Sequence, residues 1–212
     1  MILNSYWRSG ASYRLRIALN VKGLAHEIRT VHLVKNGGEQ HQPAYRAINP
    51  QGRVPSVVLD GGEVLIQSPA IIEWLEETHP NPPLLPENPL ARARVRAVAS
   101  IIGCDIQPLG NVGPLVYLKK KLGADDAANA AWVGHWIEQG FTAIEALIEG
   151  GDYCFGNAPT VADVYLVPQV YAARRFKVAL DAFPKIVHAA DYCATLDAFI
   201  KAAPQNQPDA EG

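Results

Sequence analysis

Residues 8–19 read RSGASYRLRIAL and join a polar turn directly to the start of a helical pattern. The apolar stretch Met1–Tyr6 before the turn predicts a short β-strand. A helix is expected over residues 12–22, and Gly23 suits the position just past its C-terminal end. A strand that leads through a polar turn into a helix indicates the start of an α/β unit.

This polar turn has two interpretations. A helix N-terminus presents unpaired N–H groups and partial positive charge, which favour an anion or a thiolate. Ser9 could donate a hydrogen bond to such a ligand, Gly10 would let it approach the backbone, and Arg8 could hold a carboxylate. The alternative is that Ser9 or Ser12 only caps the helix, and the turn by itself slightly favours this alternative.

The next sixty residues continue the alternation of strands and helices. Residues 26–33 predict a second strand, and two further strands at 54–59 and 63–66 flank a short turn rich in glycine. Ser68 and Pro69 suit the N-cap and the first position of a helix that reaches Glu77. The order βαβ, an irregular stretch and ββα predicts a small mixed sheet with helices packed on it.

A proline-rich segment separates this region from a helical one. His79–Pro89 holds five prolines in eleven residues, which predicts a linker rather than a helix. Beyond it, apolar residues recur every three or four positions, and Thr160 with Asp163 resembles a capping box at the head of a helix. Pro168 is expected to kink that helix, and the tail after Pro204 is expected to be loose. The predicted domains are residues 1–79, a linker at 80–89, and an all-α domain at 90–212.

Composition and charge exclude several classes of partner. The chain has 212 residues, 49% of them hydrophobic, and a net charge of −2, so neither nucleic acid nor an anionic membrane surface is an expected partner. Three widely spaced cysteines and six histidines form no metal-binding spacing, so no metal site is expected. The unpaired cysteines, with no signal peptide and no membrane-spanning run, predict a cytoplasmic protein.

Two more positions have the chemistry of a binding site. Val54-Pro55 places a proline at the start of a strand, where it suits either an ordinary edge position or a cis peptide bond. Gln67-Ser68 forms a second helix N-terminus, with an amide and a hydroxyl that could receive a carboxylate or merely cap the helix. The Val54-Pro55 pair alone decides nothing, and Gln67-Ser68 alone favours simple capping.

Taken together, these segments resemble the zeta class of the glutathione transferase family over nearly the whole chain. The motifs that carry the resemblance are Arg8–Leu19, Asn49-Pro50 with Val54-Pro55, Gln67–Glu73, Ile106–Leu109, Val167–Gln169 and Arg175–Val178. The resemblance implies a thioredoxin-like α/β N-terminal domain followed by an all-α C-terminal domain, the glutathione transferase fold. It also implies a homodimer that uses glutathione to isomerise maleylacetoacetate or maleylpyruvate, both small dicarboxylates.

The resemblance assigns a role to each matching residue. Ser9 would hydrogen-bond the glutathione sulfur beside Gly10 and Ala11, and Val54, ahead of a cis Pro55, would pair its backbone with the tripeptide. The γ-glutamyl carboxylate would lie on Gln67 and Ser68. Arg8 and Arg175 would bind the carboxylate or the developing enolate of the substrate. Further glutathione contacts would come from Gln40, Gln107 and Asn111.

The chain departs from the family at one informative position. Many members have a cysteine where this chain has Ala11, so a covalent role for that cysteine is excluded here. The attacking sulfur belongs to glutathione, so the expected isomerisation is unaffected. Two other functions stay open: a transferase that conjugates glutathione to haloacids or other small electrophiles, and a non-catalytic binding module.

Overall fold

A computed structural model describes residues 1–211, which form two compact units. The first unit joins Met1–Pro83 to residues 195–211, and the second is Leu84–Ala194. This division differs from the sequence-based one at its C-terminal end, where 90–212 was assigned to a single helical domain. Residues 195–211 lie with the first unit because helix α9, Asp197–Ala202, packs against helix α1, Gly10–Val21.

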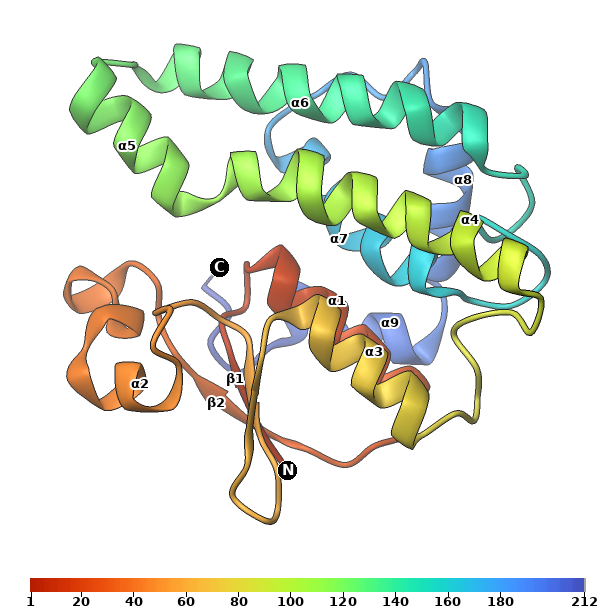
Figure 1. Cartoon of the computed structure of the whole chain (residues 1–212). Helices are drawn as coiled ribbons and strands as arrows, with labels where there is room; N and C mark the ends of the chain where they lie inside the picture. Colours follow the sequence, from red (N-terminus) through yellow and green to blue (C-terminus); the bar gives the residue numbers. More distant parts are fainter. Residues whose placement is uncertain (212) are drawn as a thin grey trace. The chain divides into compact units, whose positions relative to one another are not determined.

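The first unit is built on a four-stranded mixed sheet with the strand order β2-β1-β3-β4 (Figure 1). β1 is parallel to β2 and antiparallel to β3, and β3 is antiparallel to β4. The bounds are Ile2–Ser5 for β1, Glu27–Thr30 for β2, Ser56–Val58 for β3 and Val64–Ile66 for β4. The parallel pair follows from the βαβ crossover through α1, as the sequence predicted.

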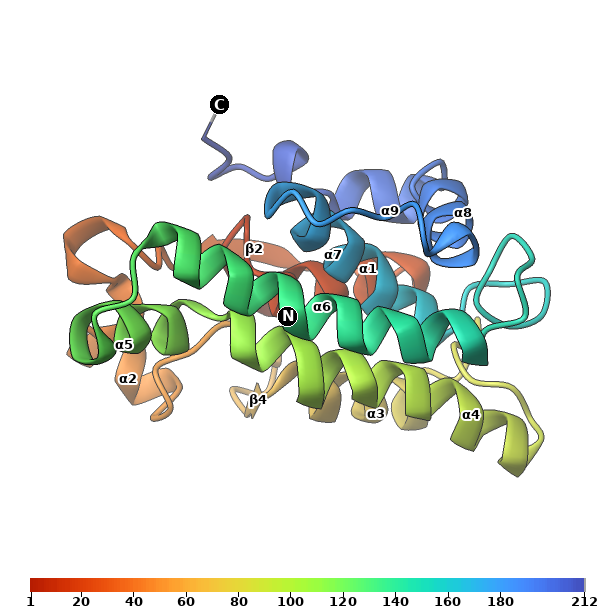
Figure 2. The same ribbon diagram turned by 90° about the horizontal axis from the view of Figure 1, so that it is seen from above.

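Helix α1 and helix α3, Ser68–Thr78, lie side by side in this unit (Figures 1 and 2). Both were predicted, but the N-cap of α3 is Gln67, so Ser68 and Pro69 occupy its first two positions. Buried Lys22, at the C-cap of α1, makes an ion pair with Glu76 of α3. This pair ties the two helices together because a buried charge is stable only with a partner.

Some elements of the first unit were not predicted. They are the short helix α2, Pro43–Ile48, and the 3-10 turns Lys35–Gly37, Glu39–His41 and Pro204–Asn206. The tail is therefore not loose, contrary to the expectation, because its backbone continues to form hydrogen bonds up to Ala210. These elements were missed because each is too short to show a hydrophobic period.

The regular secondary structure of the second unit is entirely helical. Its helices are α4 Pro89–Ser100, α5 Val112–Leu122, α6 Asp126–Leu147, α7 Val161–Arg175 and α8 Pro184–Cys193. α7 packs against α4 and α8 and is one continuous helix through Pro168. The Thr160–Asp163 capping box is present at its start, as predicted. Among residues 1–211, no helix is both long and apolar enough to cross a membrane.

Between α4 and α5 the helical geometry changes twice. Ile101–Ile106 is a π-helix, and Gln107–Gly110 is a 3-10 turn. α6 packs against this π-segment through Gly140, where an added Cβ would lie 2.2 Å from the Ile106 side chain. Glycine at this position therefore permits the close approach of the two segments. π-helical segments of this kind often occur at functional sites.

Candidate functional site

The topology of the sheet brings three of the predicted site segments to one end of it. Asn4 of β1, Ser56 of β3 and Ile66 of β4 lie in register across the antiparallel pairs. The chain leaves β1, enters β3 and leaves β4 at this same end. The segments around Ser9, Val54 and Gln67 therefore converge there, as the resemblance implied.

Ser9 is the N-cap of α1, and its hydroxyl oxygen accepts a hydrogen bond from the Ser12 N–H at 3.2 Å. The sequence offered capping and ligand binding as alternatives, but one hydroxyl can serve both. Capping uses an acceptor lone pair of Ser9 and leaves its O–H available to donate. Ser9 is half-buried, so the donor is accessible at the positive end of the helix.

A buried arginine holds the turn that carries Ser9. Arg16, one of the largest fully buried side chains, donates to the Tyr6 carbonyl at 3.4 Å and to the Trp7 carbonyl at 3.0 Å. It also donates to the Ala202 carbonyl at 2.8 Å, which links the turn to α9. The Ser9 N–H donates to the Tyr6 carbonyl at 3.0 Å. Arg16 of α1 therefore helps to fix the position of Ser9.

The other residues of the turn are more open. The Arg8 guanidinium is exposed and lies 4.4 Å from the centre of the Trp7 ring. This stacking limits the freedom of the charge without neutralising it. Gly10 and Ala11 are the first residues of α1, and both are half-buried.

Val54 and Pro55 are joined by a cis peptide bond, as the resemblance implied. β3 begins at Ser56, so the N–H and C=O of Val54 lie outside the hydrogen-bond ladder of the sheet. Tyr45 and Asn49 each donate to the Arg53 carbonyl at 2.7 Å, which fixes the chain just before Val54. Burial raises the pKa of Tyr45, so its hydroxyl stays protonated and able to donate.

Gln67 has an unusual backbone for a residue other than glycine, with φ of 67° and ψ of 110°. Such strain costs on the order of 1–3 kcal/mol and is concentrated at ligand sites. Its side-chain amide donates to the Gln51 side chain at 2.6 Å, and the neighbouring Ser68 is buried at the start of α3. The strained turn thus places a polar side chain and a helix N-terminus together.

Gln40 lies deeper than a surface loop would place it. The residue is 7% exposed, and its Nε2 donates to the Leu33 carbonyl at 3.3 Å. Its Oε1 has no hydrogen-bond partner among the described residues. The structure therefore shows a buried acceptor at this position.

The remaining predicted residues belong to the second unit. Gln107 opens the 3-10 turn, and its Nε2 donates to Oδ1 of Asn111 at 2.8 Å, so these two predicted residues are in direct contact. Arg175 is exposed at the last position of α7, with its guanidinium 4.7 Å from the centre of the Phe176 ring.

Sequence reasoning missed the residues that support the site. Arg16, Tyr45 and Asn49 are buried and hold the backbone at Trp7 and Arg53. In the sequence, Arg16 looks like any charged residue on an amphipathic helix, and nothing in its spacing predicts burial. The cysteines supply no nucleophile of their own at Cys154 or Cys193, because burial raises the pKa of both thiols.

Comparison with known proteins gives the family. Residues 5–83 match the family model for the glutathione S-transferase N-terminal domain, and residues 126–195 match that for the C-terminal domain. A maleylacetoacetate isomerase of Pseudomonas aeruginosa is 55% identical, over 99% of this chain and 98% of the relative.

Two solved structures extend the comparison. One is a maleylpyruvate isomerase described as a bacterial glutathione S-transferase of the zeta class, with a TM-score of 0.96, 53% identity and full coverage of both chains. The other is a maleylacetoacetate isomerase of Anaeromyxobacter dehalogenans with dicarboxyethyl glutathione and citrate bound in the active site. It has a TM-score of 0.87 and 40% identity, over 99% of this chain and 93% of the other. The converging helix N-termini, the cis Val54-Pro55 bond and these matches show that the chain belongs to the zeta class of the glutathione transferase family.

Proposed function

We propose that the protein is a glutathione-dependent cis–trans isomerase of maleylacetoacetate, or of maleylpyruvate. The observation that carries the proposal is the geometry at Ser9, whose O–H stays free to donate while its oxygen caps α1. A hydroxyl donor and a helix N-terminus at one point stabilise a thiolate. The relatives named as isomerases of these two substrates supply the reaction class.

In the proposed reaction the glutathione thiolate adds to one carbon of the cis double bond. A C–S bond forms, the π bond breaks, and its electron pair moves to the conjugated ketone oxygen as an enolate. The bond between the two carbons is now single and rotates. The enolate then collapses, the double bond re-forms as trans, and the C–S bond breaks to return the thiolate. No electrons or protons are gained overall, and glutathione is regenerated.

The site residues divide into two groups in this proposal. The first group binds glutathione: the Val54 backbone pairs with the tripeptide, and Gln67 with Ser68 receives its γ-glutamyl carboxylate. Gly10, Ala11, Gln40, Gln107 and Asn111 complete this set. The second group is cationic, because Arg8 and Arg175 stabilise the carboxylates and the enolate of the substrate. Their exposure in the structure is compatible with ligand contact.

A turnover assay with each substrate, with and without glutathione, tests the proposal. We expect trans product from maleylacetoacetate or maleylpyruvate only when glutathione is present, with its concentration unchanged at the end. Glutathione consumed in proportion to product would instead support the conjugating transferase. That second function is favoured by one observation, the dicarboxyethyl glutathione held by the Anaeromyxobacter structure. Turnover without glutathione contradicts both.

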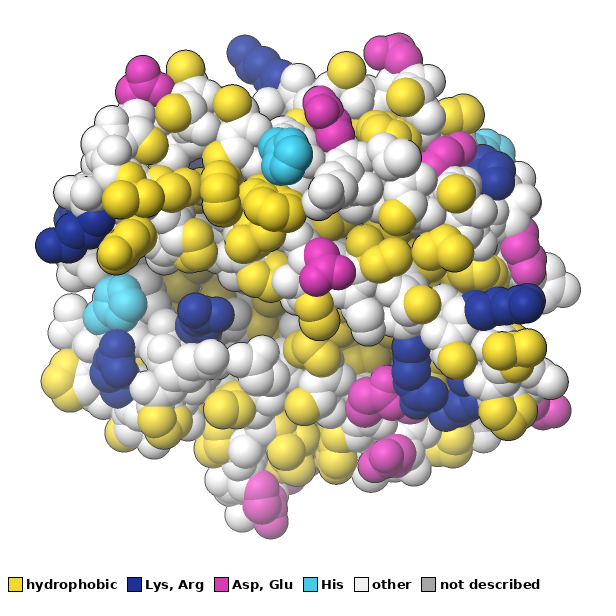
Figure 3. Space-filling model, turned by 45° about the horizontal axis from the view of Figure 1, so that its top comes forward, with side chains coloured by type: hydrophobic (Ala, Val, Ile, Leu, Met, Phe, Trp, Pro, Cys, Tyr) yellow, Lys and Arg dark blue, Asp and Glu magenta, His cyan; other side chains and the backbone are white. Residues whose placement is uncertain are grey.

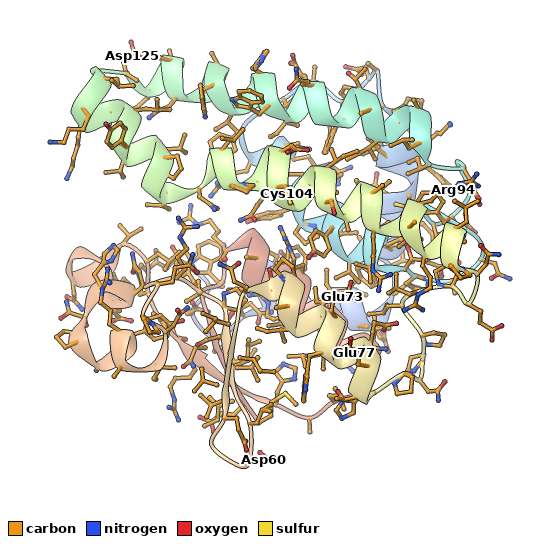
Figure 4. All side chains as sticks on the ribbon, viewed as in Figure 1. Asp60, Glu73, Glu77, Arg94, Cys104 and Asp125 are labelled. Carbon is orange, nitrogen blue, oxygen red and sulfur yellow. The ribbon has the colours of Figure 1, made fainter. Side chains whose placement is uncertain are left out.

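We further propose a homodimer in the cytoplasm. In the second unit, a groove between the π-segment and α6 is lined by Ile101, Cys104 and Trp136, among others, and Figure 4 labels Cys104 on the π-segment. Figure 3 shows hydrophobic side chains gathered over α5 and α6, and Tyr117 and Leu122 of α5 are exposed. A second copy of the chain suits this apolar face. The unpaired Cys104, Cys154 and Cys193 fit a reducing compartment.

Sedimentation of the purified protein tests the dimer. We expect a mass near twice 23.0 kDa at micromolar concentration. Trp136→Asp should shift the equilibrium toward monomer, because it replaces a large apolar side chain of the groove by a charge and adds to the negative charge of Asp105 there. A monomer in the unmodified protein would contradict the proposal.

A further inference from the structure

The C-terminal segment Gln207–Glu211 is docked on the first unit. The buried Gln207 side chain donates to the Lys201 and Ala203 carbonyls, both at 2.9 Å. Ala210 packs against the hydrophobic cluster that includes Tyr6 and Trp7. The segment therefore has its own polar and apolar anchors, and they lie beside the turn that carries Ser9.

Glu211 adds a third anchor beyond Ala210. Nδ1 of His32 accepts from the N–H groups of Val34 and Lys35, at 3.2 and 2.9 Å, so in the neutral ring the proton is on Nε2. That Nε2 donates to Glu211 at 3.3 Å, and the Lys35 ammonium pairs with the same carboxylate oxygen. Anchors thus lie on both sides of Asp209, which fixes its place.

From this fixed position, Asp209 binds the turn that carries Ser9. One of its carboxylate oxygens accepts a hydrogen bond from the Trp7 N–H at 3.0 Å. Trp7 is buried and lies two residues before Ser9, and its carbonyl is held by Arg16 on the other side of the peptide unit. Both backbone polar groups of Trp7 are therefore hydrogen-bonded to charged side chains: the carbonyl to Arg16 of α1 and the N–H to Asp209 of the C-terminal segment.

A contact of this kind has consequences for a neighbouring catalytic group. A hydrogen bond to a carboxylate is stronger than one between neutral groups. If this hydrogen bond is removed, the buried Trp7 N–H loses its partner. The free energy of the turn is then lowered when that N–H moves to a position where water can bond it. Small displacements of a catalytic group have large effects on rate. The Ser9 hydroxyl is placed by this turn, so it would move with it.

We propose that Asp209 is a positioning residue for Ser9: it holds the Trp7 N–H and thereby keeps the Ser9 hydroxyl aimed at the glutathione sulfur. This assignment rests on the proposed function in one respect, that Ser9 stabilises the thiolate. Asp209 itself needs no contact with glutathione or substrate. It makes the end of the chain part of the architecture of the active site, 202 residues away from Trp7 along the sequence.

Amide hydrogen exchange in the free protein tests the first half of the proposal. In Asp209→Ala the Trp7 amide should exchange about tenfold faster than in the unmodified protein, as expected for one lost hydrogen bond. In Asp209→Asn it should stay within about twofold, because the amide oxygen can still accept. Asp60→Ala is the matched control, since Asp60 lies at the tip of the β3–β4 hairpin (Figure 4) and its loss removes the same charge. Unchanged exchange at Trp7 in Asp209→Ala overturns the proposal.

The pKa of bound glutathione tests the second half and does not use any isomerase substrate. Titration of the thiolate absorbance in the binary complex should show a rise of about one pKa unit for Asp209→Ala, a tenfold loss of thiolate stabilisation. Asp209→Asn should leave this pKa unchanged or lower it, because a nearby negative charge is removed. Asp209→Glu keeps the charge but moves the acceptor by one methylene, so it should also raise the pKa.

The outcomes separate this proposal from the proposed function. A thiol pKa that is the same in Asp209→Ala and the unmodified protein overturns the positioning role while the isomerase function stands. A fall in Asp209→Ala equal to that in Asp209→Asn would indicate a pure charge effect and overturns it too. Failure of the unmodified protein to isomerise either substrate contradicts the function alone, provided that glutathione still binds. An unmodified protein that binds no glutathione overturns both.

Discussion

Ser9→Ala is expected to lower kcat/KM for isomerisation by about 100-fold, which is the usual effect of removing one preorganised donor from a developing anion. The Ser9 hydroxyl both caps α1 through its oxygen and offers its O–H to a ligand. Alanine removes both functions. The pKa of bound glutathione should rise in the variant, and the rate should recover as the pH is raised and the thiolate re-forms. A pH–rate profile with glutathione at saturation measures this.

A matched variant separates the two functions of Ser9. Asn88 is the N-cap of α4 in the second unit, where its side chain accepts from the N–H groups of Leu90 and Ala91. Asn88→Ala should cost about 1 kcal/mol of stability, as Ser9→Ala also should, but it should leave kcat/KM within about twofold. Ser9→Thr keeps the hydroxyl and should retain most of the activity. Equal activity in Ser9→Ala and Asn88→Ala would show that Ser9 is only a cap.

The helices that the sequence predicted are those with a hydrophobic period or a capping signal within their own residues. α1, α3 and α7 were predicted because each combines an apolar stripe with a helix-start signal, and the Thr160–Asp163 box was read directly from its residue types. α5 was missed because its apolar residues, such as Val116 and Leu122, are exposed and mark no buried face. A hydrophobic period in the sequence indicates a helix face that is buried inside its own unit, and α5 has no buried residue.

The candidate site was predicted through resemblance more than through local chemistry. Ser9, Val54 and Gln67 each had an ordinary structural explanation, and only their joint occurrence at one end of the sheet distinguishes a site. The strain at Gln67, with φ of 67°, leaves no trace in residue type. Arg16 and Asp209 were missed for another reason. Their partners are backbone groups, which are the same in every sequence and so cannot be recognised by spacing.

Asp163→Ala is expected to lower the free energy of unfolding by about 3–5 kcal/mol, because three buried donors lose their acceptor and each such loss costs about 1–3 kcal/mol. The Asp163 carboxylate is fully buried and accepts from the Cys154 N–H at 2.7 Å. Its other oxygen accepts from the N–H and the hydroxyl of Thr160, both at 2.8 Å. Alanine leaves all three donors buried without a partner, and each costs free energy.

Two further variants separate the contributions to the loss of unfolding free energy in Asp163→Ala. Thr160→Ala removes one donor and leaves both N–H bonds, so it should cost about 1 kcal/mol. Asp191→Ala is the control for a lost acidic residue, because Asp191 forms an exposed ion pair with Arg174 at 2.7 Å and such pairs contribute about 0–1 kcal/mol. Chemical denaturation of the three variants and the unmodified protein gives the free energies of unfolding.

The relative losses of unfolding free energy in the three variants show whether the Asp163 carboxylate holds α7 in place. Burial raises the pKa of Asp163, and the N–H groups of Cys154 and Thr160 oppose that rise, so the charge depends on these donors. The same carboxylate joins the start of α7 to the loop at Cys154, two segments that no other feature of the sequence links. If Asp163→Ala costs no more than Asp191→Ala, the network does not hold α7 in place, and the helix owes its position to its other contacts, among them the packing against α4 and α8.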